Sequence, residues 1–102
     1  MRNNKYMVHP GEILKEELEE LNISQNRLAM EIRVPPARVN DVIRGKRGIT
    51  PDTALRLAKF FNTSMEFWLN LQAAYDKKVV GAALKEELDK IHPLTRPVKA
   101  HA

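Results

Sequence analysis

The chain has 102 residues, a length that accommodates one domain and little more. Hydrophobic residues make up 43% and charged residues 29%, which allows both a packed core and a solvated surface. There is no cysteine, which excludes disulfides, thiol nucleophiles and thiolate metal sites. No apolar stretch approaches the roughly 18 residues that span a bilayer, and no signal peptide is recognised, so we expect a soluble cytoplasmic protein that makes no contact with membranes.

Charge is distributed unevenly along the sequence. The net charge is +4, from 17 Lys and Arg against 13 Asp and Glu. Residues 10–22 hold five Glu and one Lys, a net charge of −4, whereas residues 23–47 hold six Lys or Arg against two acidic residues, a net charge of +4. This pattern predicts two binding surfaces, the basic one for a polyanion. The alternative is that both runs are merely solvated faces.

Proline, glycine and helix-capping residues divide the chain into short helices. The predicted helices begin at Pro10, after Ser24, at Pro36, after Thr50 and after Thr63, with a sixth near residues 82–91. Asn22, Gly45 and about Tyr75 end the first, third and fifth of them. Thr63 and Glu66 have the spacing of a capping box.

Apolar residues recur at helical spacing, and no segment alternates as a strand does. The expected inward residues of the first and fourth helices are Ile13, Leu14, Leu18 and Leu21, and Ala54, Leu55, Ala58 and Phe61. We therefore predict an all-α fold. Residues 1–78 are expected to form one folded domain, and residues 79–102 a C-terminal helix with a mobile tail after Pro93.

The second and third predicted helices, joined by a tight turn, indicate a helix-turn-helix whose third helix enters the DNA major groove. With Val39, Val42 and Ile43 buried, the remaining side chains of that helix face outward. Arg38 and Arg44 have donors for guanine or phosphate, Asn40 can pair with adenine, and Asp41 can accept from cytosine. The candidate base-contacting residues are Pro36, Ala37, Arg38, Asn40, Asp41 and Arg44.

Helix starts supply candidate phosphate contacts, because their backbone N–H groups are free to bind anions. Ser24, Gln25 and Asn26 begin the second helix, and Thr50 begins the fourth. Lys46 and Arg47 lie in the loop before Thr50. Ser24 and Thr50 are also explained as helix caps alone.

The fifth helix carries apolar residues around nearly its whole circumference, so every side needs a cover. A second subunit can bury the apolar side that the monomer leaves open, which predicts a homodimer. The candidate interface residues are Phe67, Trp68, Leu71 and Tyr75. The alternative assigns all of them to the core of the monomer.

No catalytic site, cofactor or metal centre is predicted. Both serines begin helices, and His9, His92 and His101 lack the spacing of a metal site. We therefore expect a binding protein rather than an enzyme.

Three motifs carry a resemblance to a known family: HPGEILKEEL, NDVIRGKRGITPDTALRLAKFF and FWLNLQAAYD. They resemble the HigA-type (VapI-like) antitoxins of bacterial toxin–antitoxin modules, within the Cro/C1-type (XRE) helix-turn-helix family, over roughly residues 8–79. The resemblance implies a five-helix bundle with an additional C-terminal helix. It also implies a dimeric autorepressor that binds an inverted repeat in double-stranded operator DNA and neutralises a RelE-like mRNA endonuclease toxin.

The resemblance also gives the acidic first helix a candidate partner, because a basic toxin would be attracted to it. The candidate toxin-binding residues are Glu12, Glu16, Glu19 and Glu20, and the tail after His92 is a second candidate. A stand-alone repressor without a toxin, and an interaction module that has lost DNA binding, are the alternatives.

Two departures from the family pattern bear on the turn. Arg33 stands where the broader family commonly has glycine, and Pro35 and Pro36 replace the usual hydroxyl-bearing cap. The backbone of the turn and the start of the third helix are therefore left open by the sequence.

Overall fold

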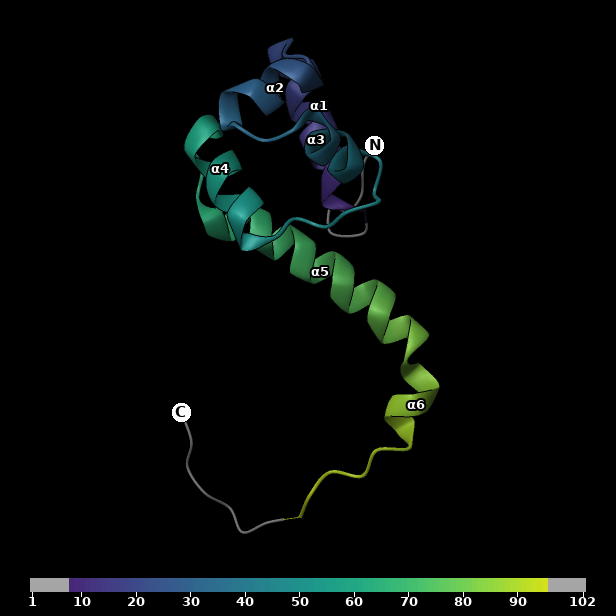
Figure 1. Ribbon diagram of the computed structural model, residues 1–102. Helices are drawn as coiled ribbons and strands as arrows, with labels where there is room; N and C mark the ends of the chain where they lie inside the picture. The colour runs from purple at the N-terminus through teal and green to yellow at the C-terminus, as the bar shows by residue number, and fades with distance from the viewer. Residues whose placement is uncertain (1–7, 96–102) are drawn as a thin grey trace.

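The computed structural model describes residues 8–95, which form helices without any strand, as predicted (Figure 1). The helices are α1 (Pro10–Leu21), α2 (Gln25–Ile32), α3 (Pro36–Ile43), α4 (Pro51–Phe61), α5 (Met65–Ala83) and α6 (Lys85–Asp89). Within the described range, none of these helices combines the length and apolarity needed to cross a membrane. The prediction of a mobile tail falls largely on residues 96–102, which lie outside the described part of the chain.

The predicted helix starts are confirmed, with one correction. Ser24 Oγ accepts from the backbone N–H of Arg27 at 3.0 Å, and Thr50 caps α4. At α5, the cap is Ser64, whose Oγ accepts from the Phe67 N–H at 3.0 Å, so the capping box predicted at Thr63 is wrong. The Thr63 hydroxyl instead accepts a hydrogen bond from the Trp68 indole N–H at 3.0 Å.

An unusual cap begins α1. The Nδ1 atom of His9 accepts from the Gly11 N–H at 2.9 Å, and the imidazole packs edge-on against Tyr75 with the ring centroids 4.9 Å apart. Burial lowers the pKa of His9, which favours the neutral ring that this acceptor role requires. The contact ties the start of α1 to the middle of α5.

The core lies between α1, α2, α3, α4 and the first half of α5. The largest fully buried side chains are Trp68, Leu14, Leu28, Leu57, Val42 and Pro10. The predicted burial of two residues is wrong: Leu21 is 51% exposed and Leu55 is 56% exposed. Leu57, which the sequence pattern missed, is fully buried in place of Leu55.

Gly11 sets the distance between α1 and α3. A Cβ atom at this position would lie 2.0 Å from the backbone oxygen of Val42 and 2.9 Å from the Cα of Ile43. Backbone atoms cannot rotate away as a side chain can. Only glycine therefore lets α1 approach α3 this closely.

The helix α5 is longer than predicted and leaves the globule. It continues unbroken to Ala83, so the domain boundary expected at residue 78 falls inside one helix. Figure 1 shows its second half, with α6, projecting away from the other helices. The predicted sixth helix is shorter than expected, at five residues.

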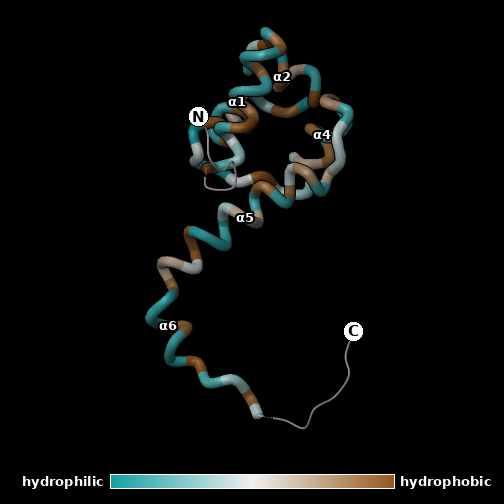
Figure 2. The backbone as a smooth tube through the Cα atoms, turned by 180° about the vertical axis from the view of Figure 1, so that it is seen from behind, coloured by the Kyte–Doolittle hydropathy of each residue, from teal (hydrophilic) through white to brown (hydrophobic). Residues whose placement is uncertain are grey.

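Hydrophobic residues recur along this projecting segment (Figure 2). The exposed apolar residues beyond the globule are Val79, Val80, Leu84, Leu88, Ile91 and Leu94, each 42–74% exposed. We call this set the projecting apolar strip. It lies on a part of the chain that the core does not cover.

Replacing Gly11 by alanine is expected to destabilise the fold by about 1–3 kcal/mol, because the new methyl group forces α1 and α3 apart. For a domain of this size each kcal/mol corresponds to a loss of roughly 4–8 °C in the melting temperature, measured by circular dichroism. Gly81→Ala is the matched control: no heavy atom lies within 4 Å of its Cβ position, and alanine favours a helix interior by roughly 0.5–1 kcal/mol. A Gly11→Ala protein as stable as the wild type would contradict the close approach.

Candidate nucleic-acid interface

The turn between α2 and α3 is built on Arg33, which occupies the left-handed region with φ 65° and ψ 48°. Its N–H donates to the carbonyl oxygen of Met30 at 3.2 Å. The N–H of the following residue, Val34, donates to the carbonyl oxygen of Ala29 at 3.0 Å. The arginine thus adopts the backbone conformation for which glycine is favoured. Pro35 stands at the N-cap without a side-chain bond, and α3 begins at Pro36 as predicted.

Contacts join the predicted DNA-contacting residues of α2 and α3. The Asn40 amide donates to the Gln25 side-chain oxygen at 3.2 Å, which links α3, the predicted recognition helix, to the start of α2. Val39 and Val42 are buried and Ile43 is half-buried, so the inward face is as predicted. The flanking residues Ser24, Asn26, Pro36, Ala37 and Arg44 are exposed.

The loop from Arg44 to Thr50 continues the same surface. Arg47 forms an ion pair with Asp41 at 3.6 Å, and Lys46 is exposed beside it. Gly45 has φ 76° and turns the chain out of α3. On the inner side of the loop, the Gln72 side-chain oxygen accepts from the Ile49 N–H at 2.7 Å, so α5 holds the loop in place.

Arg38 is held by Asp52, which is not among the predicted site residues. Its Nη1 atom donates to Asp52 Oδ1 at 2.9 Å, and Arg56 Nε donates to the same oxygen at 2.7 Å. The hydrogen bond from Arg56, together with Arg38, lowers the pKa of the Asp52 carboxyl group and keeps it ionised. The i,i+4 spacing of Asp52 and Arg56 could have been read from the sequence, whereas their link to Arg38 depends on the tertiary fold.

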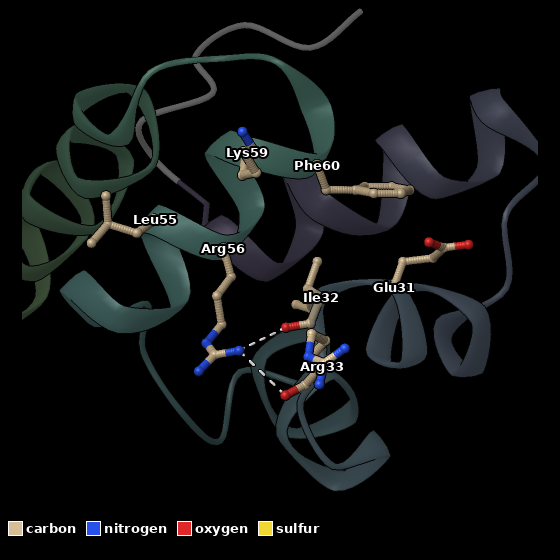
Figure 3. A pocket seen from close by; sticks show the side chains of 7 residues that line it. All are labelled: Glu31, Ile32, Arg33, Leu55, Arg56, Lys59 and Phe60. Carbon is tan, nitrogen blue, oxygen red and sulfur yellow. Dashed lines mark hydrogen bonds between the residues drawn. The ribbon is translucent and has the colours of Figure 1, made fainter.

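Arg56 connects this group to the turn. Its Nη1 atom donates to the carbonyl oxygens of Ile32 at 2.8 Å and Arg33 at 3.3 Å, as Figure 3 shows. Leu55, Lys59 and Phe60 lie beside it, around a groove of about 550 Å³ between α2 and α4. The end of α2 is therefore fastened to α4.

The predicted acidic face of α1 is on the surface. Glu12, Glu19 and Glu20 are exposed, and Glu16 is half-buried. Glu12, Glu16 and Glu19 line one shallow groove together with Arg44, at the end of the recognition helix. The acidic and basic surfaces therefore adjoin.

The structure divides the four predicted dimer residues. Trp68 and Leu71 are 1% and 3% exposed and pack in the core of the single chain, so their side chains are covered before any partner arrives. Tyr75 is half-buried against His9, and only Phe67 is well exposed. For Trp68 and Leu71 the monomer-core interpretation is therefore the correct one.

Residues 8–95 hold no cluster of three or more His, Cys, Asp or Glu side chains placed to bind a metal ion. Ser24 and Ser64 both serve as helix caps through their hydroxyl groups.

Comparison with known proteins places this interface in context. Residues 14–68 match the family described as Helix-turn-helix. Virulence-associated protein I of Dichelobacter nodosus is 43% identical over 95 residues, which are 92% of this chain and 87% of that protein.

Two solved structures are similar in both sequence and fold. An addiction module antidote protein of the HigA family from Coxiella burnetii is 49% identical, with a TM-score of 0.82 over 86% of this chain and 98% of that one. The antitoxin HigA of Pseudomonas aeruginosa, solved with the higBA promoter, is 43% identical, with a TM-score of 0.82 over 87% of this chain and 99% of its own. The first of these relatives is described as an antidote protein and the second as an antitoxin.

Proposed function

The chain belongs to the helix-turn-helix family, among its HigA-type (VapI-like) antitoxins, and from this premise we propose that it represses its own promoter as a DNA-bound dimer and neutralises a partner toxin. The observation that carries the DNA-binding part is the continuity of one surface. The start of α2, the outer face of α3 and the loop before α4 are joined by the bonds from Asn40 to Gln25 and from Arg47 to Asp41. The relative from Pseudomonas aeruginosa has a promoter bound to the same fold.

The recognition helix offers both kinds of contact that DNA reading requires. Arg38, Asn40 and Arg44 supply donors for base edges or phosphates, and Ala37 and Pro36 are exposed beside them for a thymine methyl group. Ser24, Lys46, Arg47 and Thr50 stand around α3 where phosphates flank a groove-bound helix. We assign α3 to the major groove on this basis.

A second copy of this chain is the proposed cover for the projecting apolar strip. Val80, Leu84, Leu88 and Ile91 recur every three or four residues from the end of α5, through α6, to the segment after it, and this part of the chain stands clear of the core. Two such segments can bury each other's apolar faces about a two-fold axis. A dimer with recognition helices about 34 Å apart would face an inverted repeat in the DNA.

The acidic face of α1 is the proposed toxin contact. Glu12, Glu19 and Glu20 gather exposed carboxylates that attract a basic RNA-cleaving protein. The proposed partner is a RelE-like toxin encoded beside this chain. A stand-alone repressor is the second candidate. It is favoured by the exposure of these acidic residues, because a solvated helix face explains them without any toxin.

DNA binding is expected to weaken when Arg38 and Arg44 are both replaced by alanine. Each arginine that contacts a base should cost about 1–3 kcal/mol of binding free energy, and each that contacts a phosphate should lower the salt slope by about 0.9. Electrophoretic shifts on the DNA upstream of the protein's own coding sequence measure both. Lys59→Ala with Lys77→Ala removes the same charge from α4 and α5, away from α3, and should leave the affinity nearly unchanged. Equal effects of the two double variants would refute the assignment of α3.

Dimerisation is expected to be lost when Leu84 and Leu88 are replaced by glutamate, because like charges would meet across the strip. Sedimentation should then give the mass of one 11.7 kDa chain instead of two. Operator affinity should fall about 100-fold, since the two half-sites are no longer bound together. The control is Met30→Glu, which charges another exposed apolar residue, on α2. An unchanged mass for the Leu84 and Leu88 variant would rule out this interface.

Toxin binding is expected to depend on the acidic face of α1. The triple variant Glu12→Gln, Glu19→Gln and Glu20→Gln should bind the neighbouring gene product more weakly and with less salt dependence, as titration calorimetry at two salt concentrations can show. Glu66→Gln, Glu86→Gln and Glu87→Gln remove the same charge elsewhere and serve as the control. Absence of any complex between the wild-type protein and the neighbouring gene product would favour the stand-alone repressor.

A further inference from the structure

A series of hydrogen bonds connects the end of α2, the first turn of α4 and the first turn of α3. The carbonyl oxygens of Ile32 and Arg33 accept from Arg56, Arg56 donates to Asp52, and Asp52 accepts from Arg38. The four hydrogen bonds are 2.7–3.3 Å long. Arg38, the last member, is on the outer face of the recognition helix.

The position of Asp52 is set by contacts other than the one with Arg38. It is the second residue of α4, where the helix dipole favours a carboxylate. Arg56, one turn later on the same helix, binds its Oδ1 atom at 2.7 Å and is itself anchored on the α2 carbonyls. Asp52 therefore presents a carboxylate oxygen from a defined position.

This carboxylate constrains what Arg38 can do. One of the five guanidinium N–H donors is used by Asp52, and the others stay available for a two-point contact such as guanine O6 and N7. The negative charge of Asp52 also offsets the attraction between Arg38 and a DNA phosphate. Both effects favour base reading over backbone binding.

Arg38 is the third residue of α3, in the helix end that meets base edges when a recognition helix enters the groove. We propose that Asp52 is a specificity-determining positioning residue: it holds Arg38 toward a base edge and away from the phosphates. The inference rests on the proposed DNA-binding function. Asp52 acts through Arg38 and makes no base contact of its own.

Asp52→Asn tests the inference, because it removes the charge and keeps the size of the side chain. Dissociation constants are measured over a salt series for two duplexes: the DNA upstream of the coding sequence, and a scrambled duplex of equal length and composition. The variant should bind the scrambled duplex more tightly, with a salt slope steeper by about 0.9, since Arg38 is free to contact one more phosphate. The ratio of the two affinities should fall about tenfold.

Glu66→Gln is the matched control. It makes the same change in net charge and, like Asp52, it stands in the first turn of its helix, but it lies on α5, apart from α2, α3 and the proposed dimer contact. It should leave both the affinity ratio and the salt slope at their wild-type values. An equal shift in the two variants would mean that net charge alone is responsible, which would overturn the proposal.

Two further variants make the test independent of any effect on folding. Arg38→Lys keeps the charge but loses the forked geometry, so the affinity ratio should fall without weaker binding to the scrambled duplex. In an Arg38→Ala background, Asp52→Asn should have no further effect on the ratio. An additional effect there, or an unchanged ratio in Arg38→Lys, would overturn the proposal.

Failure of this inference is distinct from failure of the proposed function. If the wild-type protein shows no preference for the upstream duplex over the scrambled one, the proposed DNA-binding function is wrong and the inference falls with it. If the wild type discriminates and Asp52→Asn discriminates equally well, only the role of Asp52 is refuted.

Discussion

The contact between α1 and α3 at Gly11 is the constraint on which the rest of the interface depends. The recognition helix has eight residues, too few to be stable as an isolated helix in water. Its position is therefore imposed by neighbours. The missing side chain of Gly11 lets α1 lie directly on the backbone of Val42, and this seats α3 with its buried face inward and its basic face outward.

Tertiary contacts then place the polar groups of the interface one by one. Gln25 holds Asn40, Asp52 holds Arg38, and Gln72 holds the loop backbone at Ile49. In each case the partner comes from a different helix than the group it holds. Geometry of this kind is prepared before DNA arrives, which lowers the entropic cost of ordering the contacts on binding.

Much of the fold could be predicted from the sequence, because local rules govern it. Ser24, Pro36, Thr50 and Pro51 mark helix starts through capping and the fixed φ of proline, and the structure keeps those starts. The prediction of a helix cap was wrong where two adjacent residues can both serve as the cap. Thr63 and Ser64 both have hydroxyl groups that can cap α5. Ser64 is the cap, whereas the Thr63 hydroxyl accepts a hydrogen bond from the Trp68 indole.

The site was harder to predict, because its contacts link residues distant in sequence. The outward residues of α3 followed from periodicity alone, but the partner of Arg38 lies 14 positions away. Arg33 illustrates the opposite case. Its identity departs from the family's glycine, yet it retains the left-handed conformation, since Val34 and Arg33 both donate to the last carbonyls of α2. The hydrogen bonds of the turn, rather than the residue type, determine that backbone.

The unbroken course of α5 joins the DNA surface to the proposed dimer. Near its middle, Gln72 accepts from the loop before α4 and donates to Asp76 at 2.9 Å, while Tyr75 packs on His9 at the start of α1. Beyond them the same helix carries Val79 and Val80, the first two residues of the projecting apolar strip, and the rest of the strip lies at the junction with α6, on α6 and after it. A helix transmits orientation along its axis, so the angle at which two strips pack would also set the spacing of two recognition helices. In the proposed dimer, α5 would therefore connect the packed core to the segment that sets the spacing of the two recognition helices.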